Sequence, residues 1–222
     1  MSTWPAGSDR ATITSMTSAA DDAWPELTEM IGAAPSARIL DGGSIEDLAR
    51  LGLTERSYLG ALVRHTGGVV IDDGWLRLLG GAGGQLPSLV DVNARSSGLC
   101  VVGFDVLGGV FALDGGAFGS GDGSVHYFAP DSLEWEALDV SHSRFVTAML
   151  TDAIGKFAES LRWDGWRDET SALALDHGVS LYPPLSTAEG KDPSASSRRP
   201  VHMSELVGDF WPGVTTGHDR NC

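Results

Sequence analysis

The sequence has few of the residues that phosphate-binding, disulfide-bonded or membrane-spanning proteins need. Only two of its fifteen basic residues are lysines, Lys156 and Lys191, and 30 acidic residues give a formal net charge of −15. A positive footprint for a phosphate backbone is therefore missing, and we predict no direct nucleic-acid binding. The longest apolar stretch, residues 98–113, is interrupted by Asp105 and is too short to cross a bilayer, so no membrane insertion is expected.

The two cysteines do not make a disulfide framework. Cys100 lies in an apolar run and Cys222 is the last residue, and neither has a neighbouring Cys or His at zinc-site spacing. The first twenty residues lack the basic and then apolar segments of a secretory signal. These observations predict a cytoplasmic protein.

What the chain does contain is ample material for a core. Seven Trp, seven Phe and three Tyr stand among 222 residues, so the chain is long enough and apolar enough to fold without a staple. Residues 1–20 carry no periodicity, and we predict a mobile tail there. Residues 21–205 are predicted to form one domain with an exposed loop at about 186–200, followed by a C-terminal tail at 206–222.

Apolar periodicity predicts helices at both ends of this domain. Trp24, Leu27 and Ile31 fall on one helical face. Ser44, with Asp47 three residues later, is typical of a helix start. The expected helices are residues 21–31, 44–50 and about 54–66, and a second set after residue 141 that includes 168–175.

Between the helices the pattern changes to short apolar runs separated by turn residues. Three hairpins are expected: 69–71 with 75–79, 99–105 with 110–113, and 125–129 with 134–138. This segregation of strands from helices predicts a single α+β domain, with a central antiparallel or mixed sheet and helices before and after it.

Aromatic residues in these segments have apolar neighbours at strand or helix spacing. Such rings usually pack in a core or at its rim, so we predict that they do so and bind no cofactor. The five rings concerned are Trp75, Trp135, Phe145, Phe157 and Trp163.

No cofactor or metal motif is complete. The dinucleotide motif fails at Leu86 and at Ser124, where glycine is required. The segment between Asp114 and Asp122 lacks the intermediate oxygen ligands of a calcium loop. A serine elbow is absent and the six histidines are scattered, so we assign no catalytic, cofactor-binding or metal-ligating residue. The sequence favours a non-enzymatic protein without a cofactor.

Five segments, taken in order, resemble an uncharacterised bacterial family of unknown function over residues 21–205: HTGGVVIDDGWLRLLGGAG, DVLGGVFALDGGAFG, YFAPDSLEWEAL, LRWDGW and YPPL. More distantly, a helix ending in His65-Thr66-Gly67-Gly68 before a strand is similar to the SUKH superfamily, whose members often act as immunity proteins against bacterial toxins. The SUKH resemblance implies an α+β sheet with flanking helices and a binding role.

Two functional hypotheses follow. The first is a non-enzymatic binding protein, an immunity protein that neutralises a basic toxin such as a nuclease. Its acidic surface would include Asp72, Asp73, Glu134 and Glu136, and complementary charge would speed association with a basic partner. Glu134 and Glu136 alternate along one predicted strand, which is typical of a solvated sheet face.

The second hypothesis is a small-molecule-binding protein or an enzyme. Its cleft would lie near Asp72, Asp73, Trp75, Arg77 and Glu134. A stoichiometric protein partner would favour the first hypothesis, and a co-purified small molecule would favour the second.

Overall fold

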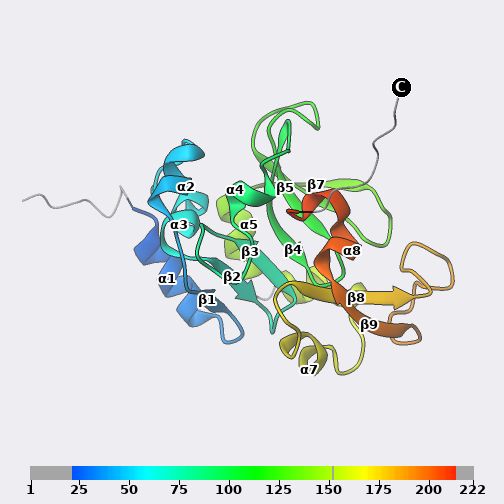
Figure 1. Ribbon diagram of the computed structural model, residues 1–222. Helices are drawn as coiled ribbons and strands as arrows, with labels where there is room; N and C mark the ends of the chain where they lie inside the picture. The colour runs from blue at the N-terminus through cyan, green and yellow to red at the C-terminus, as the bar shows by residue number, and fades with distance from the viewer. Residues whose placement is uncertain (1–21, 152, 214–222) are drawn as a thin grey trace, which may run out of the picture.

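A seven-stranded antiparallel sheet forms the centre of the computed structural model, which describes residues 22–151 and 153–213. Each strand pairs with the next one along the chain, so the sheet is a meander (Figure 1). Its strands are β1 (Arg38–Leu40), β2 (Gly68–Ile71), β3 (Leu76–Leu79), β4 (Leu99–Asp105), β5 (Val110–Asp114), β6 (Ser124–Phe128) and β7 (Trp135–Ser141). The α+β class and the three expected hairpins are confirmed.

The turns of the three hairpins lie at the same end of the sheet. β2 and β3 pair with Ile71 opposite Leu76, and Leu76 pairs in turn with Asp105 at the end of β4. Antiparallel pairing therefore places the β2–β3, β4–β5 and β6–β7 turns in a row along that end of the sheet. The predicted acidic residues all lie in or next to the first and the last of these turns.

Helices precede and follow the sheet, as the periodicity predicts. They are α1 (Trp24–Ala33), α2 (Ile45–Arg50), α3 (Tyr58–His65), α4 (Leu89–Val92), α5 (His142–Met149), α6 (Ala153–Phe157), η1 (Glu159–Leu161), α7 (Trp166–Ser171), α8 (Met203–Val207) and η2 (Gly208–Phe210). Ser44 caps α2 by accepting from the Asp47 amide, as predicted. The third helix begins at Tyr58 because the Ser57 hydroxyl accepts from the Gly60 amide. No helix in the described residues is long and apolar enough to cross a membrane.

The two faces of the sheet are covered by different parts of the chain. On one face, α5 brings Phe145 to 4.9 Å from the Phe111 ring of β5, and α3 packs against α1 and α5. On the other face, Trp211 lies 5.7 Å from Phe104 of β4, and a second, two-stranded sheet is joined on by a 2.7 Å hydrogen bond from the Val179 amide to the Val106 carbonyl. Figure 1 shows α8 crossing in front of β4. The core thus has two layers of cover.

The second sheet pairs β8 (His177–Tyr182) with β9 (Ser197–His202), and β9 begins inside the loop expected at 186–200. Its sequence, SRRPVH, has the composition of a loop, and Pro200 is tolerated because the hairpin has free edges. The expected tail also departs from the structure, since α8 and a buried Trp211 dock residues 206–211 on the sheet. The tail predicted at 1–20 and residues 214–222 lie outside the described residues.

Packing of the five predicted aromatic rings is confirmed. Trp75, Phe145 and Trp163 are buried in the main core, and Trp135 and Phe157 are partly buried against it. Trp75 and Trp163 also stand beside one another, with ring centroids 5.9 Å apart. Trp163 also lines a cleft beside the charged residues Arg162 and Arg167.

Candidate functional site

The β2–β3 turn places two predicted carboxylates next to α7. Asp72, Asp73 and Gly74 have φ values of 55°, 53° and 93°, all in the left-handed region that short polar residues and glycine tolerate. A Cβ atom on Gly74 would stand 2.8 Å from the Thr170 carbonyl oxygen of α7, so only glycine allows this approach. The Thr170 hydroxyl donates a 2.8 Å hydrogen bond to the Asp73 carbonyl, which fixes the turn against the helix.

The LRWDGW segment supplies an aromatic wall behind this turn. Gly165, with φ of 81°, turns the chain between Trp163 and Trp166 and begins α7. The Trp166 ring meets Trp75 edge-on at 5.3 Å. Because these indoles are buried against one another, the backbone of the segment is held on the sheet.

Arg162 lies between this aromatic wall and the turn. Its guanidinium donates to the Asp72 carboxylate and stacks on Trp166 at 4.0 Å from the ring centroid. The two side chains of the ion pair are 13% and 10% exposed. Burial raises the pKa of the Asp72 carboxyl above its ordinary value, and the Arg162 charge opposes that shift. Asp72 is therefore a partner of Arg162 and is not free to meet another protein.

Asp73 has a looser partner. Arg167 Nε lies 3.4 Å from the Asp73 carboxylate, and the guanidinium covers the Trp166 ring at 4.6 Å. The Arg167 side chain is 64% exposed, so it keeps donors that face solvent. Both carboxylates of the turn are thus paired with arginines from the LRWDGWR stretch.

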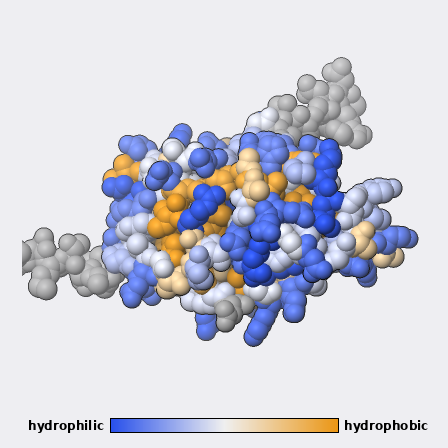
Figure 2. All heavy atoms as spheres, turned by 90° about the horizontal axis from the view of Figure 1, so that it is seen from below, coloured by the Kyte–Doolittle hydropathy of each residue, from blue (hydrophilic) through white to orange (hydrophobic). Residues whose placement is uncertain are grey.

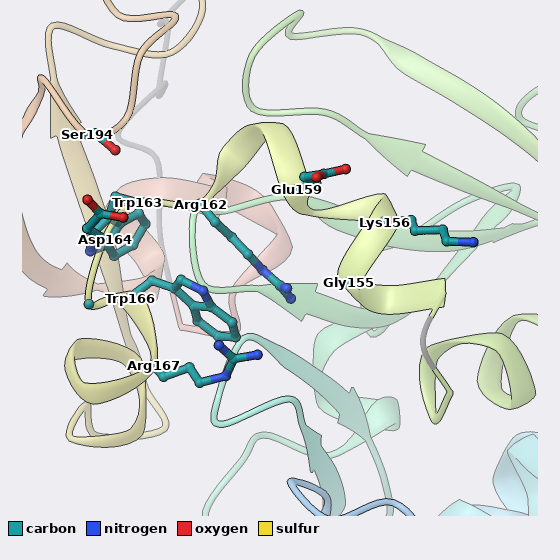
Figure 3. Close-up of a pocket in the computed structure, with 10 residues that line it drawn as sticks. Gly155, Lys156, Glu159, Arg162, Trp163, Asp164, Trp166, Arg167 and Ser194 are labelled. Atoms are coloured by element: carbon teal, nitrogen blue, oxygen red, sulfur yellow. The ribbon is translucent and has the colours of Figure 1, made fainter.

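Arg162 and Arg167, together with Lys156, line a cleft of about 600 Å³, which we call the basic cleft. Figure 3 shows Arg162 reaching across the cleft beside Trp166, with Lys156 on the side opposite Trp163 and Ser194. Glu159 and Asp164 are exposed at its wall. Its volume falls in the range of about 300–1,000 Å³ that is common for small-molecule sites.

Arg77 lies beneath a neighbouring cavity of about 240 Å³. The residue is 1% exposed, and its Nη1 donates to the carbonyls of Leu175 and His177. Burial lowers its pKa to about 10, and no carboxylate forms an ion pair with it among the described residues. Asp73 and Arg38 line the same cavity, so its wall also carries net positive charge.

A third hollow, of about 380 Å³, connects these two. It shares Arg162 and Arg167 with the basic cleft, and residues 35–37 with the Arg77 cavity. Its other walls are mostly apolar. The view from below in Figure 2 shows hydrophobic residues gathered on this side of the molecule, with hydrophilic residues among and around them.

The structure separates Glu134 from the other residues of the predicted cleft. Asp72, Asp73 and Arg77 lie around the hollows just described, and Trp75 is buried behind them. Glu134 precedes β7, four strands from β3, which is roughly 19 Å at the usual strand spacing. Glu134 and Glu136 are both exposed there, beside an edge strand, so the four predicted partner-binding carboxylates do not form one surface.

Two other conspicuous carboxylates hold loops together. Asp114 accepts from four backbone amides and from the Ser120 hydroxyl, which holds the pKa of its carboxyl well below the ordinary value. Asp105 is buried and accepts from two amides of the β4–β5 turn and from the Tyr127 hydroxyl at 2.6 Å. These hydrogen bonds use the acceptor capacity of both carboxylates within the fold.

The basic residues that line the basic cleft were not predicted from the sequence, although Arg77 of the neighbouring cavity was. Arg162 and Arg167 meet Asp72 and Asp73 across about 90 positions of chain, a distance that no local pattern reports. The alternation of Arg and Trp in LRWDGWR is the signal that was available, because guanidinium groups and indole rings stack on each other.

Comparison with known proteins identifies relatives across most of the chain. The family described as "Protein of unknown function DUF2625" matches residues 13–206. The uncharacterized protein YbfG of Escherichia coli (strain K12) is 34% identical over 196 residues, which cover 84% of this chain and 89% of that protein. An uncharacterized protein of Haemophilus influenzae is 31% identical over 188 residues, covering 79% and 82%. No solved structure matches.

Proposed function

We propose, from the premise that this chain belongs to the DUF2625 family, that it is a non-enzymatic cytoplasmic binding protein whose basic cleft takes up a small molecule bearing a phosphate or a carboxylate. One observation carries the proposal. Five of the fifteen basic residues of a strongly acidic chain gather around the basic cleft and the Arg77 cavity. They are Arg38, Arg77, Lys156, Arg162 and Arg167.

The charge of this region is only partly neutralised within the protein. Asp72 and Asp73 are used by Arg162 and Arg167, and Glu159 and Asp164 lie at the wall of the basic cleft, so these four acids leave a net charge of +1 on the five basic residues. Lys156, Arg38 and Arg77 have no ion-pair partner among residues 22–151 and 153–213. A bound anion would add the missing negative charge, and guanidinium groups suit phosphate and carboxylate geometry.

Binding is favoured over catalysis by the kinds of side chain present. The residues lining the basic cleft include neither histidine nor cysteine, and the described contacts give Ser194 no hydrogen bond from its hydroxyl to a base. Nucleophilic catalysis needs such a nucleophile–base pair. Charged groups over a tryptophan wall instead suit the retention of an anion.

Calorimetric titration with pyrophosphate and with citrate, at constant ionic strength, tests this function. We expect saturable binding by the wild-type protein, and a dissociation constant at least about 100-fold higher in Lys156→Gln/Arg167→Gln, since each of the two lost charge-assisted hydrogen bonds costs about 1.5–3 kcal/mol. Both residues are exposed, so the variant should fold. Arg50→Gln/Arg144→Gln, which removes the same two charges from exposed positions outside the cleft, is the matched control. Equal affinity in the double variant and the control would contradict the proposal.

A second candidate function is recognition of a basic protein at the β7 edge of the sheet, away from the basic cleft. Glu134 and Glu136 are exposed at β7, whose outer edge has no strand partner in the described sheet. The resemblance to SUKH immunity proteins of the helix that ends in His65-Thr66-Gly67-Gly68 before a strand suggests a toxin, such as a nuclease, as the partner. Complementary charge at such an edge would accelerate association.

This candidate is tested by association rates at low salt with a basic protein that the wild-type chain retains from its native cells. Glu134→Gln/Glu136→Gln should slow association several-fold, and the difference should fade as salt rises. Glu29→Gln/Glu189→Gln removes the same charge from other exposed positions and serves as control. A rate that changes equally in both variants would reflect net charge alone and count against the acidic edge.

A further inference from the structure

A mixed cluster of possible metal ligands lies far from the basic cleft, where the chain enters α1. Asp22, Glu55 and His65 each offer one ligand atom, and these atoms all lie within 4.8 Å of one another. His65 Nε2 is 3.9 Å from the Glu55 Oε2 atom. The Nε2 atom is buried and has no hydrogen-bond partner among the described residues, although nitrogen in such a position usually has one.

The three side chains come from separate segments that the fold locks together. The Ala23 amide donates a 2.8 Å hydrogen bond to the Glu55 carbonyl, which joins the start of α1 to the turn before α3. Asp22 Oδ1 accepts from the Trp24 amide at 2.8 Å, so its carboxylate is held at the helix start. The Trp24 ring then stacks on His65, with centroids 4.9 Å apart and an angle of 14° between the planes. The ligand atoms are therefore positioned by contacts independent of any ion.

We propose that Asp22, Glu55 and His65 bind a divalent transition-metal ion of the zinc type. One imidazole nitrogen and two carboxylate oxygens are ligands that zinc accepts, and three protein ligands leave a position for water. Calcium and magnesium prefer sites made of oxygen alone, so the histidine selects against them. Motif spacing predicts no metal, and the cluster escapes it because no two of its ligands are close in sequence.

One neighbouring charge limits the affinity. Arg64 Nε lies 3.3 Å from Glu55 Oε1 and competes for the carboxylate. The Oε2 atom, which faces His65, is the oxygen left for the ion. A metal at this position would be held by one oxygen of Glu55, with the Arg64 pair fixing the direction of the other.

The competing location for a metal is a pair of histidines on the second sheet. His177 Nδ1 lies 2.7 Å from one Asp176 oxygen, and His202 Nε2 lies 3.8 Å from the other. In contrast to His65, His177 already has a close carboxylate partner. The experiment must therefore distinguish the two locations.

Calorimetric titration of the chelator-treated full chain with Zn²⁺ and with Mg²⁺ tests the assignment. We expect one equivalent of Zn²⁺ to bind and Mg²⁺ to bind more weakly. Asp22→Asn keeps the hydrogen bond to the Trp24 amide but removes the charge, and His65→Gln removes the nitrogen ligand. Each should raise the Zn²⁺ dissociation constant about 100-fold, since even outer contacts of metal ligands contribute about 10–100-fold.

Two controls make the outcome decisive. Glu29→Gln, an exposed carboxylate of α1, should bind Zn²⁺ as the wild type does. His177→Gln/His202→Gln should also leave binding unchanged. The visible spectrum of the Co²⁺ complex, compared between wild type and His65→Gln, provides a second readout that does not depend on affinity. Absence of Zn²⁺ binding by the wild type, loss of binding in the His177/His202 variant, or a Co²⁺ spectrum unaffected by His65→Gln would overturn the proposal.

Discussion

The two pairs of carboxylates that the sequence assigns to one acidic surface have opposite surroundings. Asp72 and Asp73, in the β2–β3 turn, are each paired with an arginine of the LRWDGWR stretch. Glu134 and Glu136, four strands away, face solvent and have no ion-pair partner in the described part of the chain.

This difference shows that net charge does not reveal which carboxylates are available to a partner. In the β2–β3 turn, the acids pair with arginines that lie over the Trp166 ring, in the region that we propose to bind an anion. At β7, the same residue types remain free to attract cations. A chain with a net charge of −15 can therefore present two binding surfaces of opposite preference.

Of the four carboxylates, Asp72 should have the largest effect on stability when it is replaced, because it is buried and paired with Arg162. Asp72→Asn leaves Arg162 charged and nearly buried without its carboxylate, and breaking such a pair costs about 3–5 kcal/mol. We expect the free energy of unfolding in urea to fall by about 3 kcal/mol. Asp72→Asn/Arg162→Met, which removes both charges, should recover part of that loss. A loss below about 1 kcal/mol in the single variant would show that the pair is not important for stability.

We expect the free energy of unfolding to depend on pH through a histidine that directly follows β7. Burial lowers the pKa of His142, the first residue of α5, from 6.5 to about 4. Between pH 6.5 and 4, His142 is therefore protonated in the unfolded chain but not in the folded one. The free energy of unfolding consequently falls as the pH falls through this window. From pH 7 to pH 5 this group should contribute a loss of about 2 kcal/mol.

Urea unfolding at these two pH values, in wild type and in His142→Gln, measures this contribution. The variant should lose less stability on acidification by that amount. The same pH dependence in both proteins would assign the effect to other groups.

Asp73, the other carboxylate of the β2–β3 turn, should contribute less to stability. Asp73→Asn removes a contact to Arg167, which is mostly in solvent, and pairs of this kind contribute about 0.2–1 kcal/mol. We expect a loss of about 0.5 kcal/mol by urea unfolding at low salt, and a smaller one at high salt. A loss as large as that of Asp72→Asn would erase the distinction between the two acids of the turn.

Neutralising Glu134 and Glu136, which are exposed, should have the smallest effect on stability. Glu134→Gln/Glu136→Gln removes two exposed negative charges from an acidic protein, so repulsion falls and the free energy of unfolding should stay within about 0.5 kcal/mol of the wild-type value. Thermal melting at low and high salt measures the change. A clear destabilisation would indicate that these glutamates have partners within the fold.

The sequence predicted the central sheet well because its signals are local. Asp72-Asp73-Gly74 marks a turn between two apolar runs, and Ser44 marks a helix start within four residues. β1 was missed because three residues carry too short an alternation, and β9 because Arg-Arg-Pro is more typical of loops. Both segments are strands because they pair with β2 and β8, and a window of sequence does not contain those partners.

The candidate site was predicted only in part, for a related reason. Asp72, Asp73 and Arg77 were named from one turn and its strand, and they do line adjoining hollows. Their neighbours Arg162 and Arg167 arrive from a segment beyond the sheet. Glu134 was grouped with them because the sequence does not fix the order of strands.

The meander has a consequence for how the chain is made. A sheet whose strands pair in chain order can form progressively as synthesis proceeds, since each new strand finds its partner already in place. Arg77 does not find its partners in this order. Its guanidinium donates to the carbonyls of Leu175 and His177, which come about 100 residues later in the chain. Until those residues are synthesised, the charged Arg77 side chain keeps this face of the nascent sheet hydrated. Water leaves the face when β8 and α8 pack against it.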